Sequence, residues 1–259
     1  MISNLWNKDL YLDRNIELLT NKTIIEYDLK SANTSLCKEY NLLSMDIILE
    51  LEKLSKKKRE YRVGKLMQKD KEFKDKLTKS FSLIRERFFD ENNIEDKDIL
   101  SIKKDAIFCL RKMDKTEFGY CNFLEKNNYS SYMYIDNLEI YYSKGLLKQT
   151  IDVKGINDDI LKKHEGFMLD FFYKLFNYLE TDTIENQLRF LNRFISNYKL
   201  LKLPVGYYRE FNQYSRIVLS DSEETYDIES FIPYQHVHEH LNIDYNFFNI
   251  LLPIVKILV

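Results

Sequence analysis

A helical pattern of apolar residues runs from Lys56 to Phe89, and it constrains the fold more than any other stretch of the chain. The apolar side chains recur three and four residues apart, which is the spacing that places them on one face of an α-helix. They are Leu66, Phe73, Leu77, Phe81, Ile84 and Phe88. A single helix of this length is unusual in a globular protein, so the pattern predicts a break near the segment QKDKE, residues 68–72.

Segments with the pattern of β-strands lie on both sides of this helical stretch. β-Branched residues in the segment 21–29 predict a strand that leads to Asp28. The apolar runs ILSI and AIFCL, at residues 99–102 and 106–110, predict a tight hairpin. Aromatic and β-branched residues punctuated by Asn and Gly predict three or four further antiparallel strands in residues 116–155.

Further helices are predicted by capping residues and by the 3.6-residue period. Ser31 is placed to cap a short helix, and a second short helix is predicted to start at Ser44. Amphipathic patterns predict two longer helices at residues 158–180 and 183–201.

These elements predict an α+β protein, with a mixed sheet and a long basic helix in the first half and a helical second half. Residues 1–155 are expected to form the α+β region, and residues 156–259 a mainly helical region packed on it. A single domain that contains both regions is the alternative, because 259 residues is within the range of one large domain.

Composition excludes several classes of protein. Only six glycines and three prolines occur, and the sequence contains neither GxGxxG nor GxxxxGK[ST], the phosphate loops of dinucleotide-binding and P-loop proteins. The net charge of −2 provides no overall field that attracts nucleic acid, so any such binding must use a local patch.

The cysteines and the targeting features indicate a cytoplasmic protein. Cys37, Cys109 and Cys121 are scattered without CxxC spacing, which is typical of reduced cysteines. The N-terminal residues lack the basic start and apolar core of a signal peptide. No stretch approaches the roughly 20 apolar residues that span a membrane, so no membrane association is expected.

Two aspartates adjoin strand candidates and suit a site for two divalent ions. Asp28 is expected at the end of a strand that is followed by a helix, and Asp105 at the tip of the predicted hairpin. Two-metal phosphoryl transfer needs carboxylates on rigid neighbouring strands, with the ions about 3.5–4 Å apart. We therefore predict Asp28 and Asp105 as catalytic, metal-binding residues that use Mg²⁺ or Mn²⁺. A turn or capping role for each acid is the alternative.

A basic segment, SKKKREYRVGKLMQKDK, lies between the two acids in the sequence. On a helix, Lys58, Arg62, Lys65 and Lys69 share one face, and Lys104 adjoins the hairpin acid. A cationic face beside a two-acid site would suit a triphosphate, so we predict these five residues as nucleotide- or phosphate-binding. A solvated charged face that serves solubility is the alternative for the helix.

The order of these parts resembles the palm and fingers of a family A DNA polymerase. The segment IIEYDLKSANTSL looks like the first motif of that family, in which a strand delivers a metal-binding Asp, and Asp28 takes this place. LSIKKDAIFCL is similar to the third motif, a hairpin whose turn carries His-Asp-Glu, and Asp105 takes the Asp place. The basic helix occupies the position of the nucleotide-binding fingers helix, for which Arg62 and Lys65 are the nearest candidates. The resemblance covers residues 23–112.

The resemblance implies a palm-like sheet, association with nucleic acid and nucleotides, and two-metal nucleotidyl transfer. Lys104 and Ala106 stand where the third motif has His and Glu. This incomplete motif predicts a protein partner, and it leaves open a palm that grips nucleic acid without catalysis. The many Lys, Ile, Asn and Tyr residues indicate an AT-rich genome, which fits a virus or mobile element. A non-catalytic interaction or adaptor protein is the alternative function, since aromatic residues suit interface cores.

Two clusters follow in the last fifth of the sequence. HVHEH places three histidines on one face of an extended segment, a spacing that suits zinc or nickel, and an exposed polar loop explains it as well. They are His236, His238 and His240. The segment PVGYYREFNQYSR interleaves aromatic residues with arginines, which predicts single-stranded nucleic-acid contacts, with a packed aromatic loop as the alternative. The predicted contact residues are Tyr208, Arg209 and Arg216.

Overall fold

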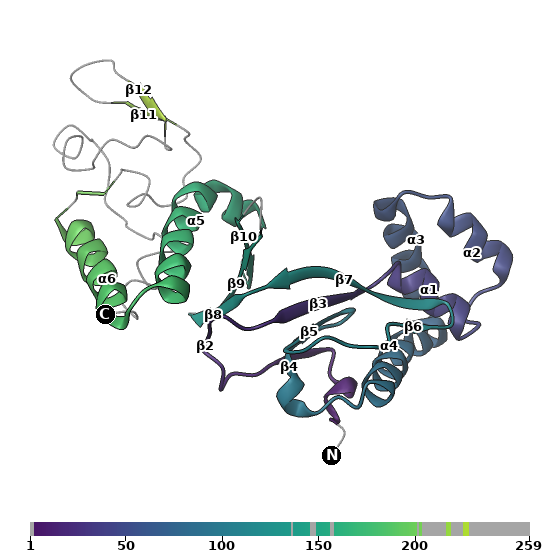
Figure 1. Cartoon of the computed structure of the whole chain (residues 1–259). Coiled ribbons are helices and arrows are strands. Elements are labelled where there is room, and N and C mark those ends of the chain that lie inside the picture. Colours follow the sequence, from purple (N-terminus) through teal and green to yellow (C-terminus); the bar gives the residue numbers. More distant parts are fainter. Residues whose placement is uncertain are drawn as a thin grey trace. The chain divides into compact units, whose positions relative to one another are not determined.

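The protein, seen in a computed structural model, forms two compact units (Figure 1). The structure describes residues 3–135, 137–145, 149–155, 158–200, 202–203, 216–218 and 225–227. The first unit holds Met1–Ile16 and Lys22–Tyr129, and the second holds Glu17–Asn21 and Ser130–Val259. The described residues combine antiparallel sheets with six α-helices, which confirms the predicted α+β class.

The first unit is built on a six-stranded antiparallel sheet. Its strands are β1 (Leu10–Leu12), β3 (Ile24–Leu29), β4 (Ile99–Lys103), β5 (Ala106–Cys109), β6 (Glu117–Phe118) and β7 (Cys121–Tyr129). Their order is β1-β4-β5-β3-β7-β6. The predicted strand is therefore confirmed as β3, and the predicted hairpin as β4 and β5, with β5 paired directly to β3.

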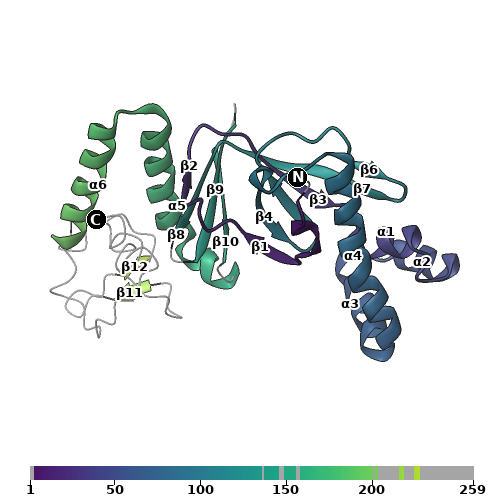
Figure 2. The same cartoon turned by 90° about the horizontal axis from the view of Figure 1, so that it is seen from below.

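Four α-helices separate β3 from β4 in the sequence. They are α1 (Ala32–Glu39), α2 (Met45–Glu52), α3 (Lys56–Lys69) and α4 (Lys71–Glu91), and two short 3-10 helices are η1 (Leu5–Asn7) and η2 (Asp96–Asp98). The predicted break in the long helical stretch falls at Asp70, whose carboxylate accepts a hydrogen bond from the Phe73 N–H at 3.0 Å. Figure 2 shows that α3 and α4 meet at this point, where the chain changes direction, and the two helices contact each other.

The predicted capping residue Ser31 does not cap α1 through its side chain. Ser31 and Ser44 precede α1 and α2 as predicted, but neither side chain makes a capping hydrogen bond. Ser31 has a left-handed backbone with φ 50°, whereas N-cap residues usually have extended backbone. The sharp turn after β3 therefore uses a conformation that few L-residues adopt.

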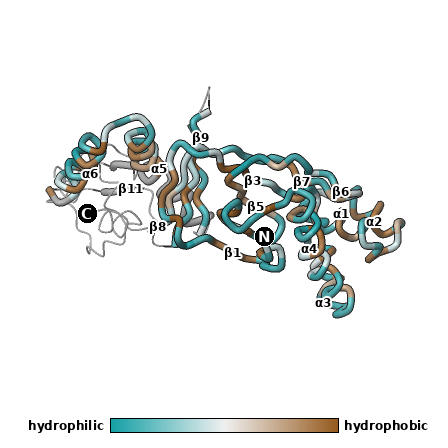
Figure 3. Tube along the Cα trace, turned by 60° about the horizontal axis from the view of Figure 1, so that its bottom comes forward, coloured by the Kyte–Doolittle hydropathy of each residue, from teal (hydrophilic) through white to brown (hydrophobic). Residues whose placement is uncertain are grey.

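The core of the first unit lies between one face of the sheet and α4. Ile25, Tyr27 and Leu29 of β3 are buried in one cluster with the apolar stripe of α4. The predicted stripe members in α4 are Phe73, Leu77, Phe81, Ile84 and Phe88, and all are buried. Because successive residues of a strand face opposite sides of a sheet, Glu26 and Asp28 lie on the face away from α4. Figure 3 shows β5 as hydrophobic and α3 as largely hydrophilic.

The second unit combines a four-stranded antiparallel sheet with two helices. Its strands are β2 (Leu18–Leu19), β8 (Ser131–Ile135), β9 (Leu138–Lys144) and β10 (Gln149–Lys154), and their order is β10-β9-β8-β2. The predicted helix pair is confirmed as α5 (Asp158–Thr181) and α6 (Ile184–Lys199). Tyr142 of β9 stacks on Phe176 of α5 with ring centroids 5.1 Å apart. The unit also contains a strand pair, β11 (Arg216–Val218) with β12 (Thr225–Asp227).

The contacts divide the chain after Tyr129, before the strands β8–β10. These strands pair with one another, and α5 lies against β10, so they group with the helices that follow. The sequence places the region boundary at residue 155, and the separate folding of those two regions stays a prediction. None of the helices in the described residues is long and apolar enough to cross a membrane.

Candidate functional site

The structure brings Asp28 and Asp105 to the same end of two neighbouring strands. Asp105 lies in the two-residue loop between β4 and β5, and the next residue, Ala106, pairs with Asp28 in the register of β5 and β3. The N–H of Leu29 donates a hydrogen bond to the carbonyl oxygen of Asp105 at 3.0 Å. The backbones that carry the two predicted acids are therefore directly connected.

Burial and neighbouring charges set the electrostatics of Asp28. Burial of the partly buried side chain raises its pKa above the ordinary value, and the ammonium group of Lys126 opposes this. The carboxylates of Asp105 and Glu26 raise the pKa further, and Lys56 lowers it. The two predicted acids are thus near enough to repel each other when both are ionised.

Glu26 lies on the same face of β3 as Asp28 and is already engaged by three partners. Its carboxylate accepts hydrogen bonds from Asn127 Nδ2 at 2.6 Å, from the Tyr129 hydroxyl at 3.0 Å and from Lys126 Nζ at 3.3 Å. The side chain is 2% exposed. Glu26 therefore adds a buried negative charge next to the site, while Asp28 and Asp105 are more accessible to solvent than Glu26.

The N-terminal turn of α3 brings cations toward this end of the sheet. Arg59 Nη2 lies 3.5 Å from the hydroxyl oxygen of Ser31, three residues beyond Asp28, and Lys56 acts on the pKa of Asp28. The first turn of α3 contains no acid. Cations are unfavourable there because a helix N-terminus carries partial positive charge, and the same charge favours bound anions such as phosphate.

The predicted cationic face of α3 lies on the outer side of the helix. Successive residues are about 100° apart around the helix axis, and the buried Val63 marks the packed side. The predicted residues are exposed and project from the other side; they are Lys58, Arg62, Lys65 and Lys69. Arg62 pairs with Glu50 of α2 at 3.6 Å, and Lys65 Nζ lies 4.6 Å from the centroid of the Tyr61 ring. Their phosphate-binding role stays a prediction.

Lys104 directs its ammonium group toward α4. Lys104 Nζ lies 4.9 Å from the centroid of the Phe81 ring, which belongs to the core cluster. The backbone of Lys104 is left-handed, with φ 56°. The lysine beside Asp105 thus makes a cation–π contact on the core side of the hairpin, and its predicted contact with phosphate stays a prediction.

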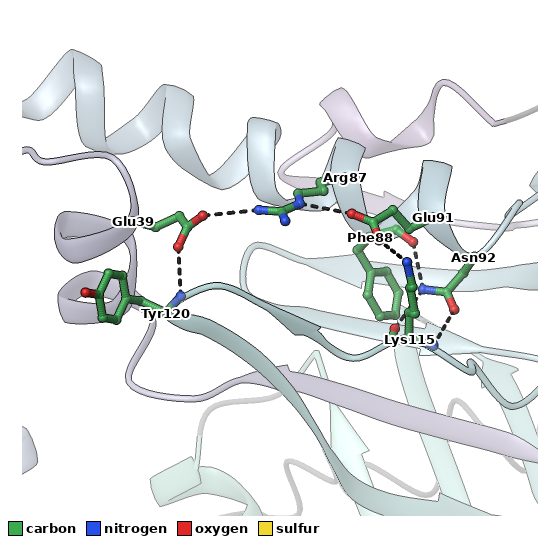
Figure 4. A network of polar contacts seen from close by, with 7 residues as sticks. All are labelled: Glu39, Arg87, Phe88, Glu91, Asn92, Lys115 and Tyr120. Carbon is green, nitrogen blue, oxygen red and sulfur yellow. Dashed lines mark hydrogen bonds and ion pairs between the residues drawn. The ribbon is translucent and has the colours of Figure 1, made fainter.

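A chain of charged contacts holds α1 and the hairpin of β6 and β7 against α4 (Figure 4). Glu39, the last residue of α1, accepts hydrogen bonds from Arg87 Nη1 at 3.1 Å and from the Tyr120 N–H at 2.7 Å. Arg87 Nε donates to Glu91 at 3.0 Å, and Lys115 Nζ donates to the other oxygen of Glu91 at 2.6 Å. Because α1 follows β3 directly, this network restrains the backbone that continues from Asp28 into α1.

Several predicted residues lie outside the part of the chain that the structure describes. They are Tyr208, Arg209, His236, His238 and His240. Arg216 begins β11, where its backbone pairs with that of Asp227. Within the described ranges, no group of three or more His, Cys, Asp or Glu side chains is arranged to hold a metal ion.

Sequence reasoning missed four residues near the acids. Glu26 could have been found, because it alternates with Asp28 in IIEYDL and must share its face of the strand. Lys56 and Arg59 belong to the basic segment, but the rotation of α3 about its axis decides which cations approach the acids. Lys126 comes from β7, and no local pattern links that strand to β3.

These observations define the class of protein: an α+β protein whose first unit carries a pair of carboxylates at the end of a helix-backed antiparallel sheet. The chain belongs to the bacteriophage PBS1 gene 130 protein family, whose model matches residues 1–259. The name of this family agrees with the predicted viral origin. No curated protein matches the chain.

Proposed function

We propose that this chain is a polymerase-palm-like protein that binds nucleic acid and uses Asp28 and Asp105 with divalent ions for nucleotidyl transfer. The observation that carries the proposal is the connection between the two acids: Asp105 lies in the loop that leads into β5, next to Asp28 of β3, and its carbonyl oxygen accepts a hydrogen bond from the Leu29 N–H. The cations at the start of α3 supply the second element, because they lie beside the same strand end.

The donor set suits a hard divalent cation. Asp28 and Asp105 offer carboxylate oxygens, the ligands that Mg²⁺ and Mn²⁺ prefer. Mg²⁺ is usually held by one or two carboxylates together with water and substrate phosphates, so a pair of acids is sufficient. Burial raises the pKa of Asp28 most, and the repulsion from Asp105 that adds to this effect is the kind that a bound cation relieves. When bound, the ions would neutralise the charge that develops on the phosphoryl oxygens.

Other residues of the chain would then supply positive charge to the site or hold the two acids in position. Lys56 and Arg59, at the start of α3, would contact phosphates of the nucleotide or nucleic acid. Lys126 would keep Asp28 ionised, because its positive charge lowers the pKa of that carboxyl. The hydrogen bond between Leu29 and Asp105 would keep the two acids at a fixed separation.

Primer extension with Mg²⁺ or Mn²⁺ tests this proposal. Wild-type protein should incorporate nucleotides, and Asp28→Asn and Asp105→Asn should each lower the rate about a hundredfold or more, because the metal supplies several kcal/mol of transition-state stabilisation. Asp114→Asn is the matched control, since Asp114 is an exposed acid outside the site. Full activity in Asp28→Asn would contradict the proposal.

A wild type without incorporation calls for a second measurement. Metal-dependent binding of a primer–template duplex, lost in Asp28→Asn, would indicate a palm that grips nucleic acid without catalysis. Absence of both incorporation and metal-dependent binding would exclude the palm function in either form.

A non-catalytic interaction protein is the second candidate, and exposed apolar side chains favour it. Met45 and Leu49 share one side of α2 with exposures of 52% and 47%, and Tyr61 of α3 is 64% exposed. Large apolar groups on a surface are typical of binding sites when they cluster. Light scattering would detect self-association, and a pull-down from infected cells with wild type and Leu49→Asp would detect a partner. A strictly monomeric protein that captures nothing specific would count against this candidate.

A further inference from the structure

Arg85 of α4 is a buried cation whose hydrogen bonds reach the loop that carries Asp105. Its side chain is 1% exposed. Nη1 donates a hydrogen bond to the carbonyl oxygen of Lys104 at 2.7 Å, and Nε donates to the carbonyl oxygen of Trp6 at 2.8 Å. Nη2 pairs with Asp9 Oδ1 at 2.7 Å. One guanidinium group therefore joins α4, the N-terminal segment and the hairpin loop.

Both backbone groups of Lys104 are held by this arrangement. Its carbonyl oxygen accepts from Arg85, and its N–H donates to the carbonyl oxygen of Asp9 at 2.7 Å. The left-handed backbone of Lys104 is unfavourable for an L-residue. Two-residue hairpin loops usually place Gly or Asn at such a position. The hydrogen bonds from Arg85 and to Asp9 stabilise this conformation of Lys104, which Gly or Asn would adopt without such support.

Stability alone is a weak reason for a buried guanidinium at this place. Exchanging a buried ion pair for apolar residues is often neutral or stabilising. The partner Asp9 is 52% exposed, so the charge of Arg85 is only partly matched in the interior. A guanidinium differs from an apolar side chain in its fixed set of donors, which can hold a carbonyl group at a defined position.

We infer that Arg85 is a positioning residue, which together with Asp9 fixes the loop and thereby holds the carboxylate of Asp105 against Asp28. The inference rests on the proposed function, because a two-acid site needs both acids at a set separation. The loop is held from two sides: Arg85 and Asp9 hold Lys104, and the N–H of Leu29 holds Asp105.

The same hairpin contains a matched control. Arg111 follows β5 and pairs with Asp98 before β4, with Nε and Oδ2 3.1 Å apart, at the end away from the loop. Arg85→Lys removes directed contacts at the loop, and Asp9→Ala removes the carboxylate that pairs with Arg85, whereas Arg111→Lys weakens the opposite end. Circular dichroism and thermal unfolding establish which variants fold. Asp9→Ala alters a half-exposed side chain, so it decides the question if Arg85→Lys does not fold.

The decisive readout is the electrostatic coupling between the two acids, followed by ¹³C NMR titration of the Asp28 carboxyl in the full chain. Asp105→Asn should lower the pKa of Asp28 in the wild type and in Arg111→Lys, because the Asp105 carboxylate raises it. In Arg85→Lys and Asp9→Ala, the same substitution should have a smaller effect. An equal effect in every background, or no effect in the wild type, overturns the inference.

Binding of Mn²⁺ alone, followed by electron paramagnetic resonance, separates the inference from the proposed function. Arg85→Lys should weaken Mn²⁺ binding about tenfold, as loss of an outer-shell partner does, and Arg111→Lys should leave it nearly unchanged. A wild type that binds no Mn²⁺ but shows the expected coupling would remove the metal site and keep the positioning role. An equal loss of Mn²⁺ affinity in both variants would overturn that role.

Discussion

The backbone N–H of Leu29 donates a hydrogen bond to the carbonyl oxygen of Asp105 at 3.0 Å. Leu29 is a core residue that is 2% exposed, and it follows Asp28 in the chain. The bond therefore connects the hairpin loop to the buried sheet at the position of the other acid. The geometry of the candidate site therefore depends on the core of the first unit. A substitution in the core near Leu29 should alter the position of the hairpin loop, and a substitution in the loop should alter the packing of Leu29.

Neutralising Asp28 should stabilise the protein at neutral pH in the absence of metal. Because the folded state raises the pKa of Asp28, it binds the proton more tightly than the unfolded chain does. The free energy of unfolding should therefore fall as pH rises from about 3.9, the ordinary pKa of Asp, through the raised value. Asp28→Asn should gain at most about 1 kcal/mol at pH 7.

Thermal unfolding of wild type and Asp28→Asn at several pH values checks this. The difference should disappear below the ordinary pKa of Asp, where the carboxyl is neutral in both states. Asp114→Asn, which changes an exposed acid outside the site, is the control variant. A less stable Asp28→Asn at pH 7 would contradict the expectation.

Substitutions at Lys104 should separate its backbone role from its charge. Lys104→Gly removes the cost of the left-handed backbone and loses the contact with Phe81, so the free energy of unfolding should change by less than about 1 kcal/mol. Lys104→Pro forbids the positive φ and removes the N–H that Asp9 accepts, and it should cost about 3 kcal/mol or more. Chemical denaturation measures both. Weakened nucleic-acid binding by a stable Lys104→Gly would instead support a phosphate contact.

The two sides of α3 should differ in their contribution to nucleic-acid binding. The double variant Lys56→Gln with Arg59→Gln removes two cations from the start of α3, and it should lower affinity and reduce the salt dependence by about 0.7–0.9 per lost phosphate contact. Lys58→Gln with Lys65→Gln removes the same charge from the outer side and should have the smaller effect. Fluorescence anisotropy over a range of salt concentrations measures both. Equal effects would show that only net charge matters.

Two glycines should respond oppositely to substitution by alanine. Gly119 has φ +61°, and a Cβ there would collide with the carboxylate of Glu39, which binds Arg87 and the Tyr120 N–H. Gly119→Ala should therefore destabilise the protein by about 2 kcal/mol. Gly64 lies within α3, where an added Cβ meets nothing within 4 Å, so Gly64→Ala should stabilise by up to about 1 kcal/mol. Urea unfolding of both variants would reveal a wrong sign directly.

Local patterns in the sequence were sufficient for most of the elements that carry the site. The helical spacing and the break were found at the right place, because Asp70 both interrupts the apolar stripe and caps α4. The strand that leads to Asp28 and the hairpin around Asp105 followed from runs of apolar, mainly β-branched and aromatic residues. The short strands β1 and β2 were missed, because three and two residues are too few to form a pattern.

The sequence by itself determined the α+β class, the main helices and strands, and the positions of Asp28 and Asp105 within these elements, because each depends on residues close together in the chain. Only the tertiary structure decided what surrounds those acids. The rotation of α3 brought Arg59 near Ser31, and the N-terminal segment brought Asp9 to Arg85. Such contacts join segments far apart in sequence, and they depend on how whole elements pack, which no local spacing of residues encodes.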